Sequence, residues 1–194
     1  MRHRIFIAIN FPEDVKKRLA DFQSQWPELP ARWTKPENLH ITLAFLGYLS
    51  DEELVKVCQI TKEVAKRHEP FLINLIKVCY GPPKKMPPRM VWAEGEKSKG
   101  LADLKNNLEK SLIEGRVSFE LEEREFKPHI TLARIRKWDF RRFEPEERPQ
   151  VDEDISLSFE VNSIEVMESQ LKRGGAEYSV LESAPLANLH EYDH

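Results

Sequence analysis

The pentapeptide His-Ile-Thr-Leu-Ala occurs twice in this sequence, at residues 40–44 and 129–133, so its two histidines lie 89 positions apart (129 − 40 = 89). Both copies have the composition of a β-strand, in which residues i and i+2 share a face. Each copy therefore presents one imidazole and one hydroxyl on one face and buries Ile and Leu on the other. A single strand histidine is more often a structural residue, and it is the matched pair His40 and His129 that favours catalysis.

Two opposed His-x-Thr strands would form a symmetric acid–base site. Imidazole titrates near pH 6.5, so one ring can act as a base while the other is protonated and acts as an acid. The hydroxyls of Thr42 and Thr131 could donate hydrogen bonds to an anion between the rings. In-line attack at phosphorus places nucleophile and leaving group on opposite sides, which suits a phosphodiester better than an ester or a peptide. The two copies are equivalent, so the spacing leaves open which histidine is the acid.

Other catalytic chemistries have little support in the sequence. Zinc sites use three or four ligands, and no His-x-His, His-Glu-x-x-His or Asp-rich motif accompanies these histidines. The sequence also lacks a Gly-x-Ser-x-Gly motif, a P-loop and a dinucleotide fingerprint. We therefore expect no metal and no cofactor. The other histidines are interpreted as surface residues: His3, His68, His190 and His194.

The overall charge leaves room for local basic patches only. The net charge of −3 argues against a protein that binds nucleic acid over its whole surface. Two segments are nevertheless basic: the Pro-rich stretch 81–89, with Lys84 and Lys85, and the stretch 134–142 after the second motif. Either these side chains contact phosphates or they are ordinary solvated cations.

The remaining composition indicates a cytoplasmic protein. Cys58 and Cys79 lack the spacing of a metal or redox motif and are interpreted as reduced structural thiols. The apolar run at residues 5–9 is too short for a signal peptide, and no stretch approaches the roughly 20 apolar residues of a membrane helix. No obvious apolar interaction stripe is present, so we expect a monomer without membrane contact.

Helix and strand patterns alternate along the chain. Ser50 followed by Glu53 has the spacing of a capping box and predicts the start of a helix. The first His strand is expected over about 39–46, ending at Gly47, and the second over about 126–135. The other predicted strands are 4–11, 71–79, 90–94, 155–161, 163–170 and 178–182, the last two forming a hairpin around 172–175. Helices are predicted from Pro12 to before Pro27, over about 51–65 and over 98–113, with a short helix or irregular segment at 139–147. Extended pieces are expected at 33–38 and 119–123, and no pattern at 187–194.

These elements predict an α+β fold for residues 1–194. We expect a single bilobal domain, in which two similar lobes of antiparallel sheet plus helices are related by a pseudo-twofold axis. Each lobe would be centred on one His strand, and the active-site groove would lie between the lobes, where ligand sites are common. With 194 residues the chain can form a substantial core in this way.

The paired motifs resemble those of the two-histidine (2H) phosphoesterase superfamily, whose pattern is two His-x-Thr/Ser-x strands. Residues 4–12, 36–47 and 126–134 extend this resemblance to the RNA 2′,3′-cyclic phosphodiesterase branch, also called the 2′-5′ RNA ligase family. The similarity covers almost the whole chain. It implies metal-independent hydrolysis of an RNA-terminal 2′,3′-cyclic phosphate to a 2′-phosphate, and possible 2′-5′ RNA ligation in reverse. The partner would be RNA or a nucleotide with that cyclic end.

The resemblance also implies roles for individual residues. His40 would donate a proton to the leaving 3′-oxygen, and His129 would accept the proton of the attacking water. Thr42 and Thr131 would hold the non-bridging oxygens. Arg134 would contact the phosphate or backbone, although a surface salt bridge is an alternative.

Three further residues near the site need an interpretation, two of them because of the alternation of side chains along a strand. In a regular strand Arg134 would face away from His129, so we expect a bend or bulge between them. Phe45 would likewise face away from His40 in a regular strand, and it is interpreted as a core residue rather than a base-stacking platform. Tyr178 lies where the family often has an aromatic residue in the last strand, and core packing explains it equally well.

Two alternative functions stay open at this point. One is a phosphodiesterase of small nucleotides, such as cyclic ADP-ribose phosphates or 2′-5′ oligoadenylates. The other is an RNA-end binding module without turnover, which the presence of both histidines disfavours. A short basic footprint would favour a small substrate, and a long one would favour RNA.

Overall fold

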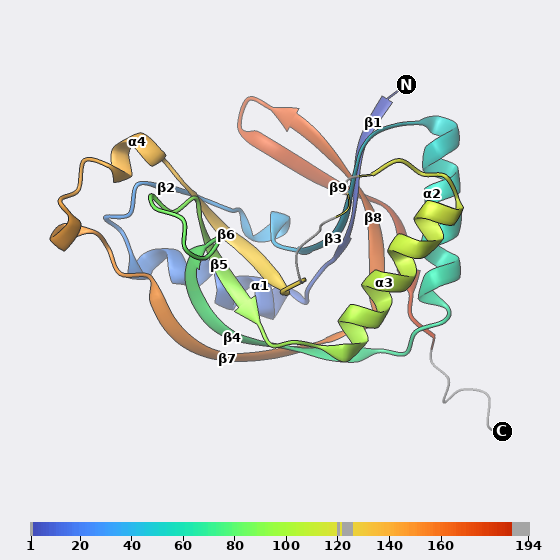
Figure 1. The fold of residues 1–194 in the computed structure, drawn as a ribbon, viewed down its shortest axis with the longest axis horizontal. Coiled ribbons are helices and arrows are strands. Elements are labelled where there is room, and N and C mark those ends of the chain that lie inside the picture. Colours follow the sequence, from blue (N-terminus) through green and yellow to red (C-terminus); the bar gives the residue numbers. More distant parts are fainter. Residues whose placement is uncertain (1, 120, 122–125, 188–194) are drawn as a thin grey trace.

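Two antiparallel sheets make up the framework of the protein in a computed structural model that describes residues 2–119, 121 and 126–187 (Figure 1). The four-stranded sheet has the order β3-β1-β8-β9, with β1 at Arg2–Ile9, β3 at Ile41–Ser50, β8 at Ser163–Lys172 and β9 at Gly175–Pro185. The five-stranded sheet has the order β2-β6-β5-β4-β7, with β2 at Ala31–Trp33, β6 at His129–Ile135, β5 at Met90–Gly95, β4 at Phe71–Gly81 and β7 at Asp152–Val161. The predicted α+β fold with two lobes is confirmed.

The helices are α1 (Glu13–Ala20), α2 (Asp51–Ala65), α3 (Lys99–Glu114) and the short α4 (Lys137–Phe140). The helices α2 and α3 pack together beside the four-stranded sheet (Figure 1). The predicted capping box starts α2, since the Ser50 hydroxyl accepts from the Glu53 amide at 3.2 Å and the Glu53 carboxylate accepts from the Ser50 amide at 2.8 Å. These bonds satisfy two amide groups that a helix start otherwise leaves unpaired.

The chain crosses between the two sheets more than once, so neither sheet is built from one continuous half of the sequence. Strand β2, from the first third of the sequence, pairs with β6 in the five-stranded sheet, whereas β8 and β9 return to pair with β1. The expectation that each lobe is centred on its His strand is therefore wrong for β3, which forms an edge of its sheet, while β6 lies between β2 and β5. The returning strand β8 pairs with the other side of β1, and no strand among the described residues pairs with the outer side of β3.

Strand β1 is buried on both faces, as its continuous apolar run predicts. Ile5, Ile7 and Ile9 face the main hydrophobic core. Phe6 and Ala8 face the opposite side, where they form a small cluster with Met167 and the partly buried Tyr178. This second cluster matters for function, because it supports one of the motif histidines.

Both His strands contain the same irregularity. In β3 the residues Thr42 and Ala44 pair with consecutive residues of β1, so that Leu43 is an extra residue. In β6 the residues Thr131 and Ala133 pair with consecutive residues of β5, so that Leu132 is the extra one. Each copy of the pentapeptide thus contains a β-bulge at its fourth residue, and both the Leu and the Ala are buried.

The bulge reverses the alternation of side chains beyond the motif. The exposed Arg134 consequently returns to the face of His129, which confirms the predicted irregularity. The equivalent residue of the first copy is Phe45, which is 61% exposed, so its interpretation as a core residue is wrong. The first strand also continues beyond Gly47 to Ser50, because Gly47 takes a φ of +70° that bends the strand without ending it.

The extended piece expected at 33–38 is wrong in its second half, because residues Pro36–Asn38 form a 3-10 helix after the short strand β2. The remaining elements agree with the sequence patterns to within a few residues, including the hairpin of β8 and β9 and the short α4. The extended piece at 119–123 and the end at 187–194 lie mostly outside the described residues. No helix in the described ranges is long and apolar enough to cross a membrane.

Cys58 and Cys79 are both free thiols, and burial raises the pKa of Cys79 to about 12, which makes it a poor nucleophile at neutral pH.

Candidate active site

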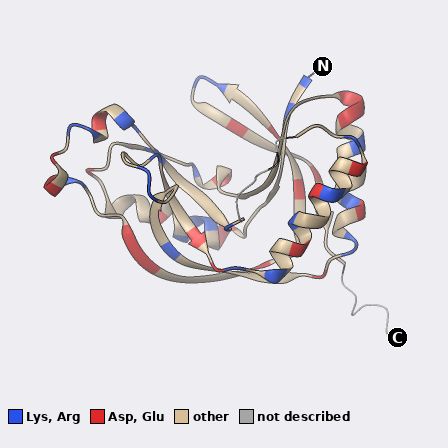
Figure 2. Cartoon of the chain, viewed as in Figure 1, with Lys and Arg blue, Asp and Glu red and all other residues tan. Residues whose placement is uncertain are grey.

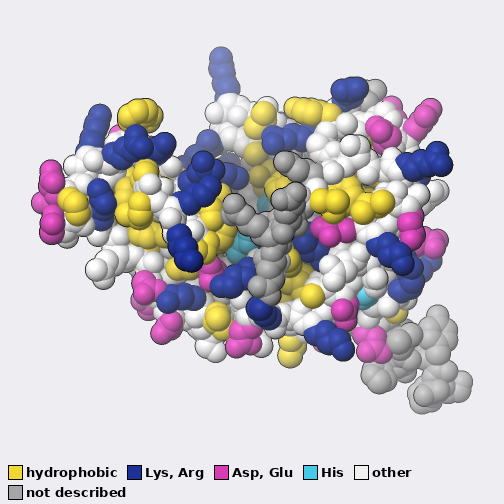
Figure 3. Space-filling view, in the orientation of Figure 1, with side chains coloured by type: hydrophobic (Ala, Val, Ile, Leu, Met, Phe, Trp, Pro, Cys, Tyr) yellow, Lys and Arg dark blue, Asp and Glu magenta, His cyan; other side chains and the backbone are white. Residues whose placement is uncertain are grey.

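The two His strands approach each other across the two lobes. Cα atoms of β3 and β6 come within 8 Å, although the strands belong to different sheets. Figure 3 shows histidine side chains at the bottom of a hollow in the middle of the molecule, with Lys and Arg side chains on its rim. The structure thus brings together the two faces that the repeated pentapeptide predicts.

A backbone carbonyl orients each catalytic candidate in the same way. His40 Nδ1 lies 2.7 Å from the carbonyl oxygen of Asn38, and His129 Nδ1 lies 2.9 Å from the carbonyl oxygen of Lys127. A carbonyl oxygen only accepts, so Nδ1 carries a proton in both rings. The other nitrogen, Nε2, is therefore the atom that can gain or lose a proton, and both histidines are suited to proton transfer through it.

His40 stands against the small aromatic cluster. Its ring centroid lies 4.9 Å from that of Phe6 and 5.3 Å from that of Tyr178, which it meets edge-on. Its Nε2 lies 3.0 Å from the hydroxyl of Thr42. Tyr178 therefore contacts the site and packs against Phe6 at the same time, so both interpretations of this residue hold.

The surroundings of His40 favour its neutral form. Burial of the ring lowers the pKa of His40 below 6.5, and the positive charges of Arg134 and Lys16 lower it further, whereas the Asn38 carbonyl raises it. The charge of Arg134, on the opposite His strand, thus acts on His40 across the groove.

This electrostatic link predicts a measurable titration. In the free protein His40 should titrate below pH 6.5, and Arg134→Gln should raise its pKa, because removal of a nearby positive charge favours the imidazolium. NMR titration of the imidazole Cε1–H signals would show both effects. His3, whose pKa is raised mainly by its hydrogen bond to Glu168, is an internal control that should not move. An unchanged His40 pKa in the variant would mean that Arg134 does not reach the site.

His129 is positioned by an aromatic residue that the sequence analysis missed. The indole of Trp92 stacks on the imidazole with ring centroids 4.0 Å apart and an interplanar angle of 23°. Trp92 pairs with Thr131 in the adjacent strand. The sequence signal was the alternation of side chains in a strand: Trp92 lies between the apolar Val91 and Ala93, which are buried, so its indole lies on the opposite face of β5.

The space for this indole depends on Gly81. A Cβ atom at Gly81 would overlap the six-membered ring of Trp92. We therefore expect Gly81→Ala to displace Trp92 and to lower turnover at least tenfold through His129, with a smaller effect on substrate KM. The NMR signal of His129 should shift in the same variant. Glycine 174, at which a Cβ would meet nothing within 4 Å, supplies the control Gly174→Ala, and equal turnover of both variants would refute the positioning role of Gly81.

The two threonines lie on the faces that carry the histidines. Thr42 contacts His40 directly, whereas the Thr131 hydroxyl has the Met90 sulfur as its neighbour at 3.8 Å. Thr34, which directly follows β2, is hydrogen-bonded to β6. Its hydroxyl donates to the Thr131 carbonyl at 2.9 Å, and its amide donates to the Leu132 carbonyl at 2.8 Å. Thr42 and Thr131 are both partly exposed, so their hydroxyls can bind an anion in the groove.

Arg134 is exposed on the side of Thr131 and Met90. Among the described residues it makes no ion pair, so the salt-bridge alternative has no partner there. Its neighbour in register, Arg32, reaches the turn of the β8–β9 hairpin and donates to the carbonyl of Gly174. Asn38 donates to the Ala176 carbonyl at 2.9 Å, so the hairpin is held by β2 and by the segment that precedes β3.

The other histidines do not join this site. His3 and His68 lie partly exposed at the surface, as expected, where His3 pairs with Glu168 and Asp51 and His68 pairs with Asn107. His190 and His194 lie outside the described residues. In the part of the chain that is described, no three His, Cys, Asp or Glu side chains are grouped so that they could hold a metal ion.

Comparison with known proteins gives a consistent result. The family model "LigT like Phosphoesterase" matches the chain twice, over residues 9–92 and 94–178, and each match contains one copy of the pentapeptide. The RNA 2′,3′-cyclic phosphodiesterase of Thermus thermophilus is 33% identical over 96% of this chain and 92% of that protein. The protein of the same name from Methanocaldococcus jannaschii is 28% identical over 92% of this chain and 98% of its own length.

Solved structures share the fold. TT0787 of Thermus thermophilus superposes with a TM-score of 0.80 and 30% identity, covering 94% of this chain and 97% of that one. E. coli LigT in complex with 3′-AMP superposes with a TM-score of 0.76 and 25% identity, covering 96% and 99% of the two chains.

Proposed function

Because this chain belongs to the LigT-like phosphoesterase family, we propose that it hydrolyses RNA-terminal 2′,3′-cyclic phosphates to 2′-phosphates by acid–base catalysis between His40 and His129. The observation that carries the proposal is the matched orientation of the two rings, each held at Nδ1 by the carbonyl two residues earlier. This leaves one Nε2 on each opposed strand for the two ends of an in-line displacement. The relatives named RNA 2′,3′-cyclic phosphodiesterase support the choice of substrate.

In the proposed reaction His129 Nε2 takes a proton from a water molecule as the water oxygen bonds to phosphorus. The bond between phosphorus and the 3′-oxygen breaks, and His40 Nε2 gives its proton to that oxygen. The product has a 2′-phosphate and a free 3′-hydroxyl, and proton exchange with solvent restores both rings. Each proton transfer contributes about 10²–10⁴ in rate.

The acid role of His40 requires its protonated form, which the free protein disfavours. The negative charge of the bound phosphate opposes the charges of Arg134 and Lys16 and so raises the pKa of His40 in the complex. The substrate thereby helps to protonate the acid that its own cleavage needs. Thr42, Thr131 and Arg134 stabilise the non-bridging oxygens as charge develops on them.

The exposed ring of Phe45 extends this site toward the nucleoside. Its centroid lies 6.0 Å from that of Phe6, which also contacts His40. A ring exposed on this side is available to stack on a nucleobase, and such stacking tolerates any base. This accords with a substrate defined by its cyclic phosphate end.

The decisive experiment is turnover of a nucleoside 2′,3′-cyclic phosphate in excess EDTA, with the product isomer identified. Conversion to the 2′-phosphate is expected. A 3′-phosphate product would reverse the bond that breaks, and loss of activity in EDTA would contradict metal-independent catalysis. If this substrate is not cleaved while 2′-5′ linked oligoadenylate is, the small-nucleotide alternative would replace the proposal. Formation of 2′-5′ linkages between RNA ends would use the same groups in reverse and can be assayed alongside.

A further inference from the structure

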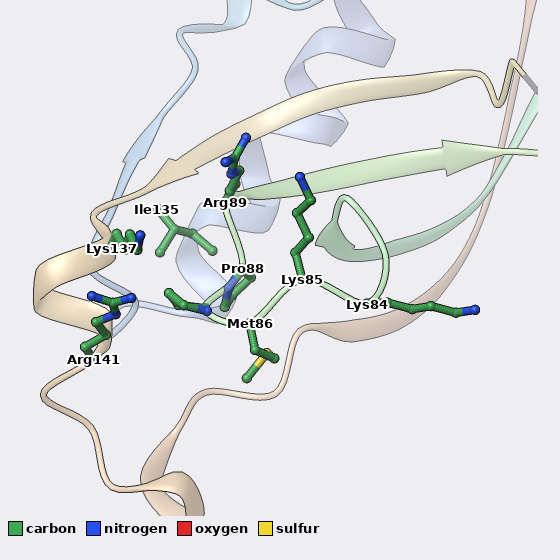
Figure 4. Close-up of a pocket in the computed structure, with 9 residues that line it drawn as sticks. Lys84, Lys85, Met86, Pro88, Arg89, Ile135, Lys137 and Arg141 are labelled. Atoms are coloured by element: carbon green, nitrogen blue, oxygen red, sulfur yellow. The ribbon is translucent and has the colours of Figure 1, made fainter. Parts of the chain in front are cut away.

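A basic hollow lies at the far end of β6, the strand that begins with His129. It has a volume of about 470 Å³. The connection between β4 and β5 contributes three cations to its lining, and the α4 region contributes two more (Figure 4): Lys84, Lys85, Arg89, Lys137 and Arg141. No acidic residue is among the described residues that line it. The two basic segments of the sequence therefore meet in one place, about 50 positions apart along the chain.

Concentration of charge at this hollow contrasts with the protein as a whole, whose net charge is −3. Figure 2 shows the blue Lys and Arg segments of the β4–β5 connection facing the α4 region. Within the described ranges, Lys85, Arg89 and Lys137 form no ion pair that would neutralise them. A cluster of uncompensated cations in a concave surface raises the local concentration of anions and points to an anionic ligand.

An exposed tryptophan makes the ligand more specific. Trp138 in α4 is 76% exposed, and the guanidinium carbon of Arg141 lies 5.3 Å from the centroid of a Trp138 ring. Exposed aromatic rings interleaved with cations are typical of surfaces that bind single-stranded nucleic acid, since the cations take phosphates and the ring stacks on a base. A site for inorganic phosphate alone would have no use for the indole.

The position of the hollow relates it to the catalytic groove. Strand β6 runs from His129 to Ile135, and Ile135 lines the hollow. The two residues are six positions apart along the strand (135 − 129 = 6), which is roughly 20 Å at about 3.3 Å per residue. At about 3.4 Å per stacked nucleotide this corresponds to about six nucleotides, and to fewer in an extended strand. Arg134 is exposed between the two places.

We propose that this hollow binds the RNA strand on the 5′ side of the cyclic phosphate, with Lys85, Arg89 and Arg141 on backbone phosphates and Trp138 on a base. The inference rests on the proposed function, because the cyclic end must lie between His40 and His129. It makes the preferred substrate an oligonucleotide and not a mononucleotide.

The test compares two substrates, a nucleoside 2′,3′-cyclic phosphate and an eight-nucleotide RNA with the same cyclic end. For the variant Lys85→Ala/Arg141→Ala we expect kcat/KM to fall about tenfold on the RNA and less than twofold on the nucleotide. Loss of two phosphate contacts should also reduce the slope of log kcat/KM against log salt by about 1.4, at about 0.7 per contact for single strands. The matched control is Lys56→Ala/Lys66→Ala, which removes two exposed lysines from the α2 region in the other lobe.

A binding measurement separates this inference from the proposed catalysis. The RNA ending in a 2′-phosphate should quench tryptophan fluorescence, and Trp138→Phe should remove the part of that quenching that exceeds the part caused by a mononucleotide 2′-phosphate, which reaches only Trp92 beside His129. Binding that depends on Lys85, Arg141 and Trp138 without any turnover would refute the catalytic proposal and support the binding site. Equal kcat/KM of the wild-type protein on both substrates, or equal losses in the variant and its control, would overturn the inference.

Discussion

Replacing either motif histidine with alanine is expected to lower kcat/KM for a nucleoside 2′,3′-cyclic phosphate by about 10²–10⁴, while the protein stays folded. Each ring performs one proton transfer through Nε2, and no neighbouring group in the described site can take its place at the same geometry. His40→Ala and His129→Ala should also be similar in their effects, because the two rings are held in the same way. Single-turnover kinetics with each variant would measure the loss.

The double variant His40→Ala/His129→Ala sharpens this prediction. Residues that act as one unit are strongly non-additive, so the double variant should be little worse than either single one. His68→Ala is the matched control, since His68 is partly buried and hydrogen-bonded to Asn107 on another part of the surface. Activity within twofold of the wild-type protein in either single variant would exclude the two-histidine mechanism, provided that circular dichroism shows the native fold.

Loss of a motif hydroxyl is the second large effect. We expect Thr131→Val to lower kcat by about 10²–10³ without much change in KM, the range found when one donor to a developing oxyanion is removed. Valine keeps the shape and the β-branch of threonine, so β6 should fold as before. Thr131→Ser retains the donor and should recover most of the activity.

The equivalent change in the first strand tests the pseudo-symmetry. Thr42 contacts His40 Nε2 at 3.0 Å, so Thr42→Val removes a donor to the phosphate and also a partner of the acid. Its effect should therefore equal or exceed that of Thr131→Val, and the pH profile of kcat should change only in Thr42→Val. If both valine variants kept wild-type kcat, the threonines would be structural residues of their strands.

Local sequence determined the side chains that each His strand presents. The two-residue period of a strand places His40 with Thr42 and His129 with Thr131, whatever the rest of the fold is. The capping box at Ser50 is equally local, since both of its hydrogen bonds join residues three apart. The bulge before Arg134 could also be predicted, because in a regular strand this side chain would face away from His129 and could not contact the same ligand.

Phe45 could have been predicted by the same reasoning. The two pentapeptides are identical, and an irregularity required before Arg134 implies one before Phe45. The interpretation of Phe45 as a core residue rested on its hydrophobicity alone. An aromatic side chain at a ligand site is, however, often exposed.

Tertiary structure alone decided which strands are neighbours and therefore what surrounds each ring. Trp92 lies on His129 because β5 pairs with β6 in one register, and Arg134 acts on His40 because two sheets meet. The return of β8 and β9 to β1, which makes β3 an edge, and the meeting of Lys85 with Arg141 are likewise contacts between distant segments. Side-chain alternation is a property of a few consecutive residues, whereas strand pairing depends on the packing of the whole core, which no short stretch of sequence specifies.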